Sequence, residues 1–366
     1  MAIVDWKNVL VVQTSFLGDT VLTLPLLSEI KRRFPEGKLT LLCAPVGREI
    51  LASHPDIDEI IVDDKRRVDA GLSGLRRKAK MLRSKDFTLA ISPHRSFRSA
   101  LLLLLARIPY RVGFRQSKGA FLFHTLANRD PLRHDVLRNL SILEALGIST
   151  EDCRHVIDLP VIPGSKEKIR RLLDSAGIDL NQTVVGINAG SVWATKRWSP
   201  DSFAVLIRRL KQDLNCQIIL FGGPEDAATV ARIQELCGTS VAMLAGKTAL
   251  CDLPAAVSAC HLFITNDSGP MHIAVARSVP VVAIFCATTP SLGFYPYSSK
   301  AVVVEKELSC RPCSSHGGRR CPLGTEDCIK LIRPEHVLQA VKQVLQHRDE
   351  FPVACATGYE PRYLTV

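Results

Sequence analysis

Runs of consecutive apolar residues alternate along the chain with stretches of helical spacing. In the first part of the chain such runs predict β-strands at 8–14, 38–44, 59–64 and 87–92. Because these runs are apolar at successive positions, both faces of each strand must be covered, which is typical of a parallel sheet between two layers of helices. Helical spacing at 21–34, 97–107 and 136–146 supplies helices for those layers.

Two prolines and a glycine interrupt this rhythm at 159–165, and we interpret the interruption as a linker. The rhythm then resumes, with strands expected at 183–189, 216–222, 240–245, 261–265 and 279–285. A chain of 366 residues is too long for one ordinary core. We therefore predict an α/β protein with two Rossmann-like domains facing across a cleft. The expected segments are 1–164, 165–348 and a C-terminal tail at 349–366.

In open parallel sheets the ligand crevice lies at the carboxyl ends of the strands, so polar stretches that follow the expected strands are candidate sites. After the first strand, Gly18 permits a tight turn and Asp19 lies near the start of a helix. The helix dipole would keep such a carboxylate ionised and able to accept a proton. A plain helix-capping aspartate also fits the pattern, and the residues alone leave both interpretations open.

A second candidate site precedes a helix that follows the strand at 183–189. Ser199 and Pro200 are a capping residue and a first-turn proline. Lys196 and Arg197 lie just before them and add positive charge beside a positive helix end. That arrangement is unfavourable alone and becomes favourable if an anion such as a pyrophosphate lies between the two side chains.

A third stretch, "FGGPEDAA" (221–228), combines paired glycines with an acidic residue. The glycines let the backbone approach a ligand, and Glu225 could accept hydrogen bonds from a ribose or a base. A turn followed by a helix cap explains the same pattern equally well.

The fourth stretch is "TNDSGPMHIAVA" (265–276). A first-turn proline with Ser268 or Asp267 as cap gives it a purely structural explanation. Ser268 and Gly269 also present backbone N–H groups at a helix N-terminus, and His272 lies one turn further on, which favours an anion site. Together with Lys196 this predicts a nucleotide diphosphate site, while the lack of a Walker A or G-x-G-x-x-G motif argues against an ATPase or a dehydrogenase.

The net charge of +11 is concentrated in one segment, since residues 65–118 hold 15 basic and two acidic residues. Such a cluster indicates a polyanionic partner, either nucleic acid, an anionic membrane surface or a phosphorylated glycolipid, or else a solvated basic surface. The chain shows no RNP motif, zinc finger or helix-turn-helix signature, so we expect no nucleic-acid partner. We also expect no secretion signal and no spanning helix, and hence a cytosolic protein.

The sequence contains 12 cysteines, most of them scattered singly. Several lie in or beside apolar runs and are expected to act as small hydrophobic residues: Cys43, Cys216, Cys260 and Cys286. A cluster is formed by Cys310, Cys313, Cys321 and Cys328. Its spacing leaves open a structural metal site, disulfides or free thiols, and it fits no standard zinc module.

Four motifs resemble the heptosyltransferases of glycosyltransferase family 9, most closely the lipopolysaccharide heptosyltransferase II type. They are "TSFLGDTVLTLPLL", "AGSVWATKRWSPDSF", "ILFGGPED" and "NDSGPMHIAVA". The resemblance runs from residue 8 to about 345 with matching order and spacing. It implies the GT-B fold, with the acceptor bound mainly by the first domain and the nucleotide sugar by the second.

The resemblance also implies a role for individual residues. Asp19 matches the general base, while Gly18, Arg95 and Arg98 are expected near the acceptor. Those expected to bind the donor are Lys196 and Ser191 at the phosphates, Glu225 at the ribose, Thr248 near the adenine, and Asp267, Ser268, Gly269 and His272 at the diphosphate and sugar.

The implied reaction transfers L-glycero-D-manno-heptose from ADP-heptose to the heptosyl-Kdo2-lipid A inner core of lipopolysaccharide, with inversion and without a metal ion or other cofactor. The expected location is the cytoplasmic face of the inner membrane, in peripheral contact with anionic lipid. The alternatives are a family-9 transferase with another donor or acceptor, a GT-B nucleotide-sugar epimerase, and a non-catalytic binder of anionic glycolipid or nucleotide.

Overall fold

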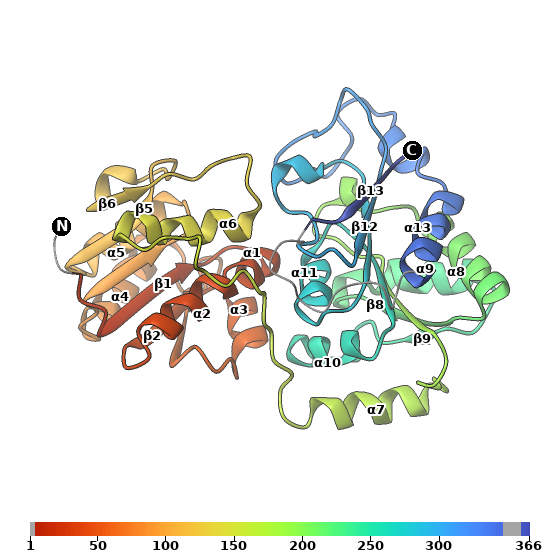
Figure 1. Cartoon of the computed structure of the whole chain (residues 1–366), viewed down its shortest axis with the longest axis horizontal. Helices are drawn as coiled ribbons and strands as arrows, with labels where there is room; N and C mark the ends of the chain where they lie inside the picture. Colours follow the sequence, from red (N-terminus) through yellow and green to blue (C-terminus); the bar gives the residue numbers. More distant parts are fainter. Residues whose placement is uncertain (1–3, 347–359) are drawn as a thin grey trace. The chain divides into compact units, whose positions relative to one another are not determined.

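The structure is a computed structural model that describes residues 4–346 and 360–366, and the chain divides into two compact units (Figure 1). The first unit comprises Met1–Leu159 and the second Pro160–Val366. The division falls at the start of the segment that we interpreted as a linker, five residues before the expected boundary at 164. Each unit has its own parallel sheet and its own buried core.

The first unit is built around a sheet with the strand order β3-β2-β1-β4-β5-β6. These strands are β1 (Asn8–Gln13), β2 (Lys38–Cys43), β3 (Glu59–Val62), β4 (Leu89–Ser92), β5 (Tyr110–Phe114) and β6 (Thr125–Ala127). Neighbouring strands pair in parallel, and β1 lies between β2 and β4. As the continuous apolar runs predicted, both faces of β1 are buried.

Helices cover both faces of this first sheet. They are α1 (Leu17–Leu22), α2 (Leu24–Arg33), α3 (Pro45–Leu51), α4 (Gly71–Arg83), α5 (Phe97–Leu105) and α6 (Asp135–Leu140), with the short helices η1 (Ala120–Leu122) and η2 (Ser141–Leu146). The helices α4 and α5 contact each other and bury Leu75 and Leu102 against Leu10 and Val12 of β1. The helices α1, α2, α3 and α6 contact one another in a separate group.

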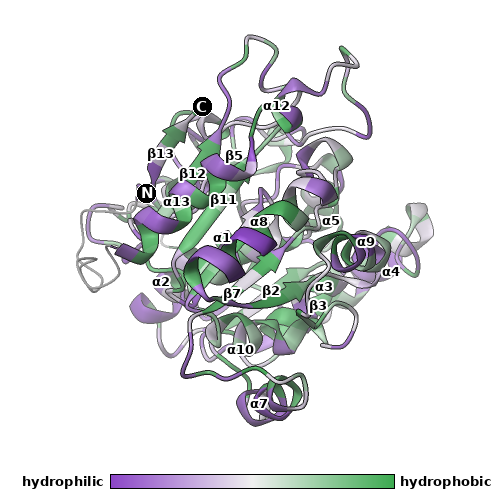
Figure 2. Ribbon diagram, turned by 90° about the vertical axis from the view of Figure 1, so that its right-hand side faces the viewer, coloured by the Kyte–Doolittle hydropathy of each residue, from purple (hydrophilic) through white to green (hydrophobic). Residues whose placement is uncertain are grey.

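The second unit has a sheet with the order β13-β12-β11-β10-β7-β8-β9, again parallel. Its strands are β7 (Val184–Asn188), β8 (Gln217–Phe221), β9 (Ala242–Met243), β10 (Leu262–Asn266), β11 (Val281–Phe285), β12 (Ala301–Glu305) and β13 (Arg362–Thr365). Strands such as β2 and β11 are green along their length in Figure 2, as expected of strands buried on both faces.

Its helices are α7 (Ser165–Ser175), α8 (Pro200–Leu214), α9 (Ala227–Cys237), α10 (Leu253–Ser258), α11 (Gly269–Ala276), α12 (Asp327–Lys330) and α13 (Pro334–Gln346). The short helices are η3 (Ala194–Lys196), η4 (Pro224–Asp226), η5 (Leu250–Asp252) and η6 (Pro290–Leu292). One core unites α8, α9 and α13 with alternate residues of the strands. Across the parts of the chain that the structure describes, no helix is both long and apolar enough to cross a membrane.

Several elements differ from the pattern-based predictions. The helix expected at 21–34 is divided at Thr23, because Pro25 cannot continue the hydrogen bonds of the preceding helix and instead occupies the first turn of α2. The strands β5, β6 and β12 were not predicted. Of the C-terminal tail expected at 349–366, residues 349–359 lie outside the described residues, whereas residues 362–365 form β13 and pair with β12 rather than extending as a tail.

The winding direction of each sheet reverses at one place. The chain moves outward from β1 to β3 and returns to β4 on the other side of β1, and it repeats this course from β7 to β9 and back to β10. In open α/β sheets the ligand crevice lies at the carboxyl ends of the strands that flank such a switch point. The loops after β1 and β4, and those after β7 and β10, are therefore the expected ligand positions.

Trp198 fixes the loop that follows β7. Its indole is 1% exposed, lies edge-on to Phe203 at 4.9 Å between ring centroids, and donates a hydrogen bond from Nε1 to the Ile332 carbonyl at 2.7 Å. The loop is thereby tied to the core and to the segment before α13.

We expect Trp198→Phe to lower the free energy of unfolding by about 1–3 kcal/mol, since it leaves the buried Ile332 carbonyl without its donor. Chemical denaturation followed by circular dichroism measures the change. Trp193→Phe is the matched control in the same loop, because Trp193 is only partly buried, and should change stability by less than about 0.5 kcal/mol. Equal stability of the two variants would contradict the anchoring role.

Candidate functional site

Asp19 lies at the switch point of the first unit, in the first turn of α1 directly after β1. Its carboxylate accepts hydrogen bonds from the Ser15 hydroxyl at 3.0 Å and from the Phe16 backbone N–H at 3.3 Å. Gly18 is the second residue of α1 and does not have a positive φ, so it is not the tight-turn glycine that we expected. The carboxylate closes the helix start and is also partly exposed.

Burial, and then the nearby charge of Asp135, raises the pKa of Asp19 to about 6, although its hydrogen bonds to Ser15 and Phe16 act in the opposite direction. The helix dipole was expected to keep this group ionised, and the desolvation cost of the charged form outweighs that effect here. At neutral pH the carboxylate is still mostly ionised, and a pKa near the working pH suits a general base.

Basic side chains surround Asp19 at the carboxyl edge of the sheet. Lys65 follows β3, donates to the Thr14 carbonyl at 2.7 Å and interacts electrostatically with Asp19. Arg95 follows β4 and also interacts with Asp19, with Arg129 and with Asp135. Burial lowers the pKa of Lys65 and of Arg95, which shows that both cations are partly desolvated beside the carboxylate.

Arg98 does not share this arrangement with Arg95. Arg95 precedes α5, whereas Arg98 lies in its first turn and forms an ion pair with Asp63 at 3.1 Å. Arg98 also donates to the Asp69 carbonyl at 2.7 Å. These bonds tie α5 to the loop before α4, so the structure gives Arg98 a positioning role, and its contact with an acceptor remains a prediction.

In the second unit two asparagines form the framework of the switch point. Asn188 and Asn266 are the last residues of the neighbouring strands β7 and β10. The Asn266 side chain accepts from the Trp198 N–H at 3.0 Å and donates to the Ala189 carbonyl at 2.7 Å, while Asn188 donates to the Ser268 hydroxyl at 3.3 Å. We did not predict these residues, although Asn188 is the last residue but one of the strand expected at 183–189 and Asn266 directly follows the strand expected at 261–265.

Lys196 and Asp267 form an ion pair at this switch point. The Lys196 Nζ lies 2.7 Å from the Asp267 Oδ2, and the side chains are 14% and 7% exposed. The Thr288 hydroxyl donates to the same carboxylate oxygen at 2.6 Å, and Ser191 donates to the Asp267 carbonyl at 3.4 Å. The structure thus brings together Lys196, Ser191 and Asp267. The positive charge of Lys196, which we expected a ligand anion to balance, is balanced by Asp267.

The helix α11 begins at Gly269 with Ser268 as N-cap, but the Ser268 side chain makes no capping hydrogen bond. Its hydroxyl instead contacts Asn188 and Thr265. Ser268 is thus the N-cap residue, as the structural explanation allowed, but it holds this position without a capping hydrogen bond from its side chain. Since the N-cap side chain leaves the first N–H groups of α11 without a capping bond among the described residues, the helix end remains suited to an anion.

His272 is buried one turn into α11, and its Nδ1 has no hydrogen-bond partner within the described residues. Burial lowers its pKa to about 4, with Lys196 acting in the same direction and Asp267 in the opposite one. The imidazole is therefore neutral at physiological pH and can present a donor or an acceptor, but not a positive charge.

Glu225 and Thr248 lie further along the same sheet edge, after β8 and β9. Glu225 is exposed and Thr248 partly buried. The residue that faces the loop after β7 is Asp226, because a Cβ on Gly190 would lie 2.2 Å from its carboxylate. Asp226 also accepts from the Gly223 N–H at 3.0 Å and lies near Arg197. Asp226 was not predicted, because its contact with Gly190 is visible only in the folded structure.

The cysteine-rich segment reaches the same edge. Gly318 and Thr195 exchange hydrogen bonds of 2.8 and 3.1 Å, which places the segment beside η3 and Lys196. The cysteines of the cluster are free, and Cys328 is buried in the core of the unit. Within 4–346 and 360–366 no group of three or more His, Cys, Asp or Glu side chains is arranged to hold a metal ion, so the structural metal interpretation is not supported.

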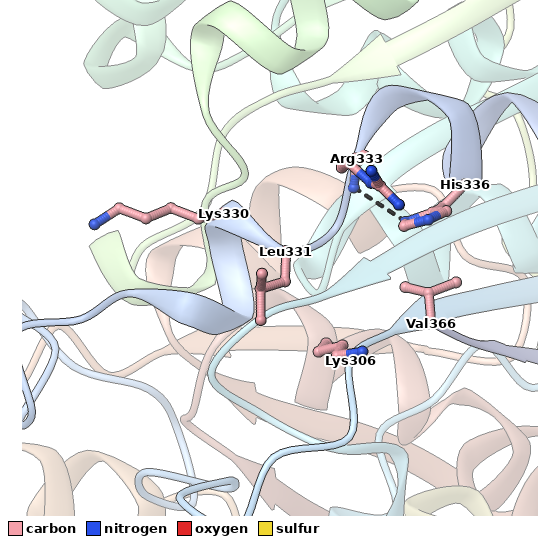
Figure 3. Close-up of a pocket in the computed structure, with 6 residues that line it drawn as sticks. All are labelled: Lys306, Lys330, Leu331, Arg333, His336 and Val366. Carbon is pink, nitrogen blue, oxygen red and sulfur yellow. Dashed lines mark hydrogen bonds between the residues drawn. The ribbon is translucent and has the colours of Figure 1, made fainter.

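A separate surface pocket of 490 Å³ lies beside α12 and the start of α13 (Figure 3). It is lined by Lys306, Lys330, Leu331, Arg333, His336 and Val366. The Arg333 N–H donates to the His336 Nδ1 at 3.1 Å, while the Lys330 ammonium points away from these residues. These lining residues differ from those predicted for the donor and the acceptor.

Comparison with known proteins identifies the family. The sequence profile of glycosyltransferase family 9 (heptosyltransferase) matches residues 75–322. Lipopolysaccharide heptosyltransferase 3 of Escherichia coli is 30% identical over 296 residues, which is 78% of this chain and 85% of that protein.

Two solved structures share the fold. A glycosyltransferase of family 9 from Veillonella parvula superposes with a TM-score of 0.83 at 27% identity, covering 94% of this chain and 98% of that one. The ADP-heptose LPS heptosyltransferase II of Escherichia coli gives 0.74 at 24% identity, covering 93% and 99%. With its two parallel-sheet units of the GT-B type, this chain is a member of the heptosyltransferases of glycosyltransferase family 9.

Proposed function

We propose that the protein transfers L-glycero-D-manno-heptose from ADP-heptose to a heptosyl-Kdo2-lipid A acceptor, with inversion at the anomeric carbon. The observation that carries the proposal is the carboxylate of Asp19, whose pKa of about 6 and basic surroundings suit a base that acts on a hydroxyl of an anionic sugar. Closing the start of α1 explains the carboxylate in a binder without catalytic activity, but it does not require basic side chains beside it.

The second unit supplies the donor half of the proposal. A diphosphate at the switch point would meet the uncapped N-terminus of α11 and the ammonium of Lys196. Asp267 holds that ammonium in place, so we assign Asp267 to positioning rather than to direct contact with phosphate. Glu225 and Thr248 are assigned to the ribose and the adenine, because they follow the next two strands along the edge.

The first unit supplies the acceptor half. Lys65 and Arg95 flank Asp19 from two sides and would bind carboxylates of the acceptor as charge-assisted pairs. With the acceptor bound, Asp19 would take the proton from the attacking hydroxyl as the hydroxyl oxygen bonds to the anomeric carbon. The departing ADP carries the developing negative charge, which Lys196 and the N–H groups of α11 would stabilise without a metal ion.

The acceptor of this reaction is anchored in a membrane, so the proposal includes a location. We propose that the protein works at the cytoplasmic face of the inner membrane, in peripheral contact with anionic lipid. The basic segment 65–118 of the first unit supports this contact by its charge.

Incubation of the purified protein with ADP-heptose and heptosyl-Kdo2-lipid A should release ADP and add one heptose to the acceptor by mass spectrometry. Transfer should persist in excess EDTA. Epimerisation of the sugar nucleotide without a change in acceptor mass would favour the epimerase alternative, and transfer only to a different core acceptor or from a different donor would assign another member of the family. Binding without any turnover would overturn the proposal.

Asp19→Asn should lower the transfer rate by about 10²–10⁴-fold, because the amide cannot accept the proton. A stability measurement separates loss of fold from loss of catalysis. Because burial disfavours the charged form of Asp19, removing that charge should not destabilise the folded protein. The variant should be at least as stable as the parent above pH 6 and up to about 3 kcal/mol more stable, an advantage that fades as the pH falls toward 3.8. A folded variant with normal turnover would exclude Asp19 as the base.

The rate at subsaturating acceptor should rise with pH through about 6 and level off above it, because Asp19 must be ionised to act as a base. His272 titrates near 4 and leaves the neutral range unaffected. A stopped assay between pH 5 and 8 measures the profile, and a profile without a limb near pH 6 would contradict the assignment.

Lys196→Ala should weaken ADP binding by about tenfold to a hundredfold, since a desolvated charge-assisted contact contributes about 1.5–3 kcal/mol. Isothermal titration calorimetry with ADP measures the effect. Lys342→Ala is the matched control, because Lys342 is exposed on α13, and it should bind ADP as the parent does. Unchanged affinity in Lys196→Ala would remove this lysine from the donor site.

A further inference from the structure

The outward side of α4 carries a stripe of one apolar and three basic residues. Leu72, Arg76, Lys80 and Arg83 follow one another at helical spacing and are all exposed. The side of α4 that faces the sheet carries Leu75, Ala79 and Leu82, which are buried. Within the described residues, the side chains of Arg76, Lys80 and Arg83 form no hydrogen bond and no ion pair, so their charges are available to an external partner.

Beside this stripe, α5 and η1 expose large apolar side chains. Phe97, Leu104 and Leu105 of α5 are 44%, 37% and 42% exposed, and Phe121 of η1 is 78% exposed. The rings of Phe97 and Phe121 lie 6.4 Å apart. Isolated exposed apolar residues need no explanation, but several neighbouring ones beside a basic stripe indicate an interaction surface.

The two sets belong to one face of the first unit. The helices α4 and α5 contact each other and share the core beneath them. Their N-termini are joined by Arg98, which donates to the carbonyls of Asp69, before α4, and of Gly71, the first residue of α4. Gly119 brings η1 against α5, since a Cβ there would lie 2.7 Å from the Ala100 side chain. We call this face the α4–α5 surface; it comprises Leu72, Arg76, Lys80, Arg83, Phe97, Leu104, Leu105 and Phe121.

We propose that the α4–α5 surface docks the first unit on an anionic lipid bilayer, with the arginines and lysine of α4 at the phosphate groups and with Leu72, Phe97 and Phe121 inserted between the headgroups. The proposal rests on the proposed function, which needs access to a membrane-anchored acceptor, and it names the part of the protein that makes the contact.

The combination of positive charge and exposed apolar side chains favours an anionic bilayer over a second copy of the chain or a nucleic acid. Basic residues near an anionic membrane surface each add binding free energy, and exposed leucine and phenylalanine side chains gain more on leaving water. A second copy of the chain would bring two basic α4 stripes together, which is repulsive. A nucleic acid would neutralise the charges but would leave Leu72, which the bilayer takes up, in water.

The position of the surface suits its use. The helices α4 and α5 begin at the same carboxyl edge of the sheet as α1, which carries Asp19. Leu72 lies in the first turn of α4 and Phe97 begins α5. The inserted side chains are thus at the edge where Lys65 and Arg95 surround Asp19, so a sugar extending from an anchored lipid reaches the base without leaving the membrane surface.

Co-sedimentation of the full chain with vesicles tests the proposal. The protein should bind vesicles that contain phosphatidylglycerol and should leave vesicles of phosphatidylcholine alone largely unbound, with the difference shrinking at high salt. The triple variant Arg76→Gln, Lys80→Gln, Arg83→Gln should lose about 100-fold in the partition coefficient. The double variant Leu72→Ser, Phe121→Ser should lose at least about tenfold at any salt concentration.

Two control variants lie in the second unit. Arg170→Gln with Arg171→Gln removes exposed charges from α7, and Leu323→Ser removes an exposed apolar side chain. Both should bind vesicles as the parent does. Equal loss in the controls, or equal binding of the parent to both kinds of vesicle, would overturn the proposal. So would a parent dimer, or a tight RNA complex, that the α4–α5 variants abolish while vesicle binding stays unchanged.

Transfer to a soluble acceptor fragment without acyl chains separates this proposal from the proposed function. The α4–α5 variants should retain normal turnover with that fragment, and they should lose turnover only when the acceptor is embedded in vesicles. A parent that binds anionic vesicles but transfers no heptose would refute the function alone. If the α4–α5 variants transferred heptose to the vesicle-embedded acceptor as well as the parent does, the docking surface alone would be refuted.

Discussion

Parallel pairing of every neighbouring strand is the constraint from which the functional geometry follows. Because the strands of each sheet run in one direction, every connection must cross back over a face, and the loops after the strands collect at one edge. The reversal of winding between β1 and β4, and again between β7 and β10, separates the flanking helices and opens that edge to a ligand. Asp19 and the Lys196–Asp267 pair both occupy such positions.

The two edges differ in how they treat charge. In the first unit a carboxylate is partly desolvated among lysine and arginine side chains, and its proton affinity rises because burial outweighs its hydrogen bonds. In the second unit the positive charge of Lys196 is balanced by Asp267, whose carboxylate also accepts a hydrogen bond from Thr288. One edge therefore holds a group that can exchange a proton, and the other holds a fixed, charge-balanced framework.

The sequence predicted the strands that are apolar at every position and the helices that begin with Ser-Pro or Asn-Asp-Ser-Gly-Pro. It did not predict short strands such as β6, whose three residues are too few to show a pattern. The residues placed near the switch points were foreseen as single candidates, but their partners were not. The pairing of Lys196 with Asp267 and the contact of Gly190 with Asp226 depend on segments about 70 and 36 residues apart, and neither spacing nor composition encodes such contacts.

The Lys196–Asp267 pair has a consequence for selectivity among anions. An edge whose cation is already neutralised offers a free phosphate or sulfate ion little net attraction, because the incoming charge must compete with a carboxylate that Thr288 holds in place. A ligand with further contacts along the edge, near β8 and β9, can offset the free energy needed to compete with Asp267. At the proposed donor site Asp267 would thus compete with abundant small anions for Lys196 and would favour a larger ligand with further contacts.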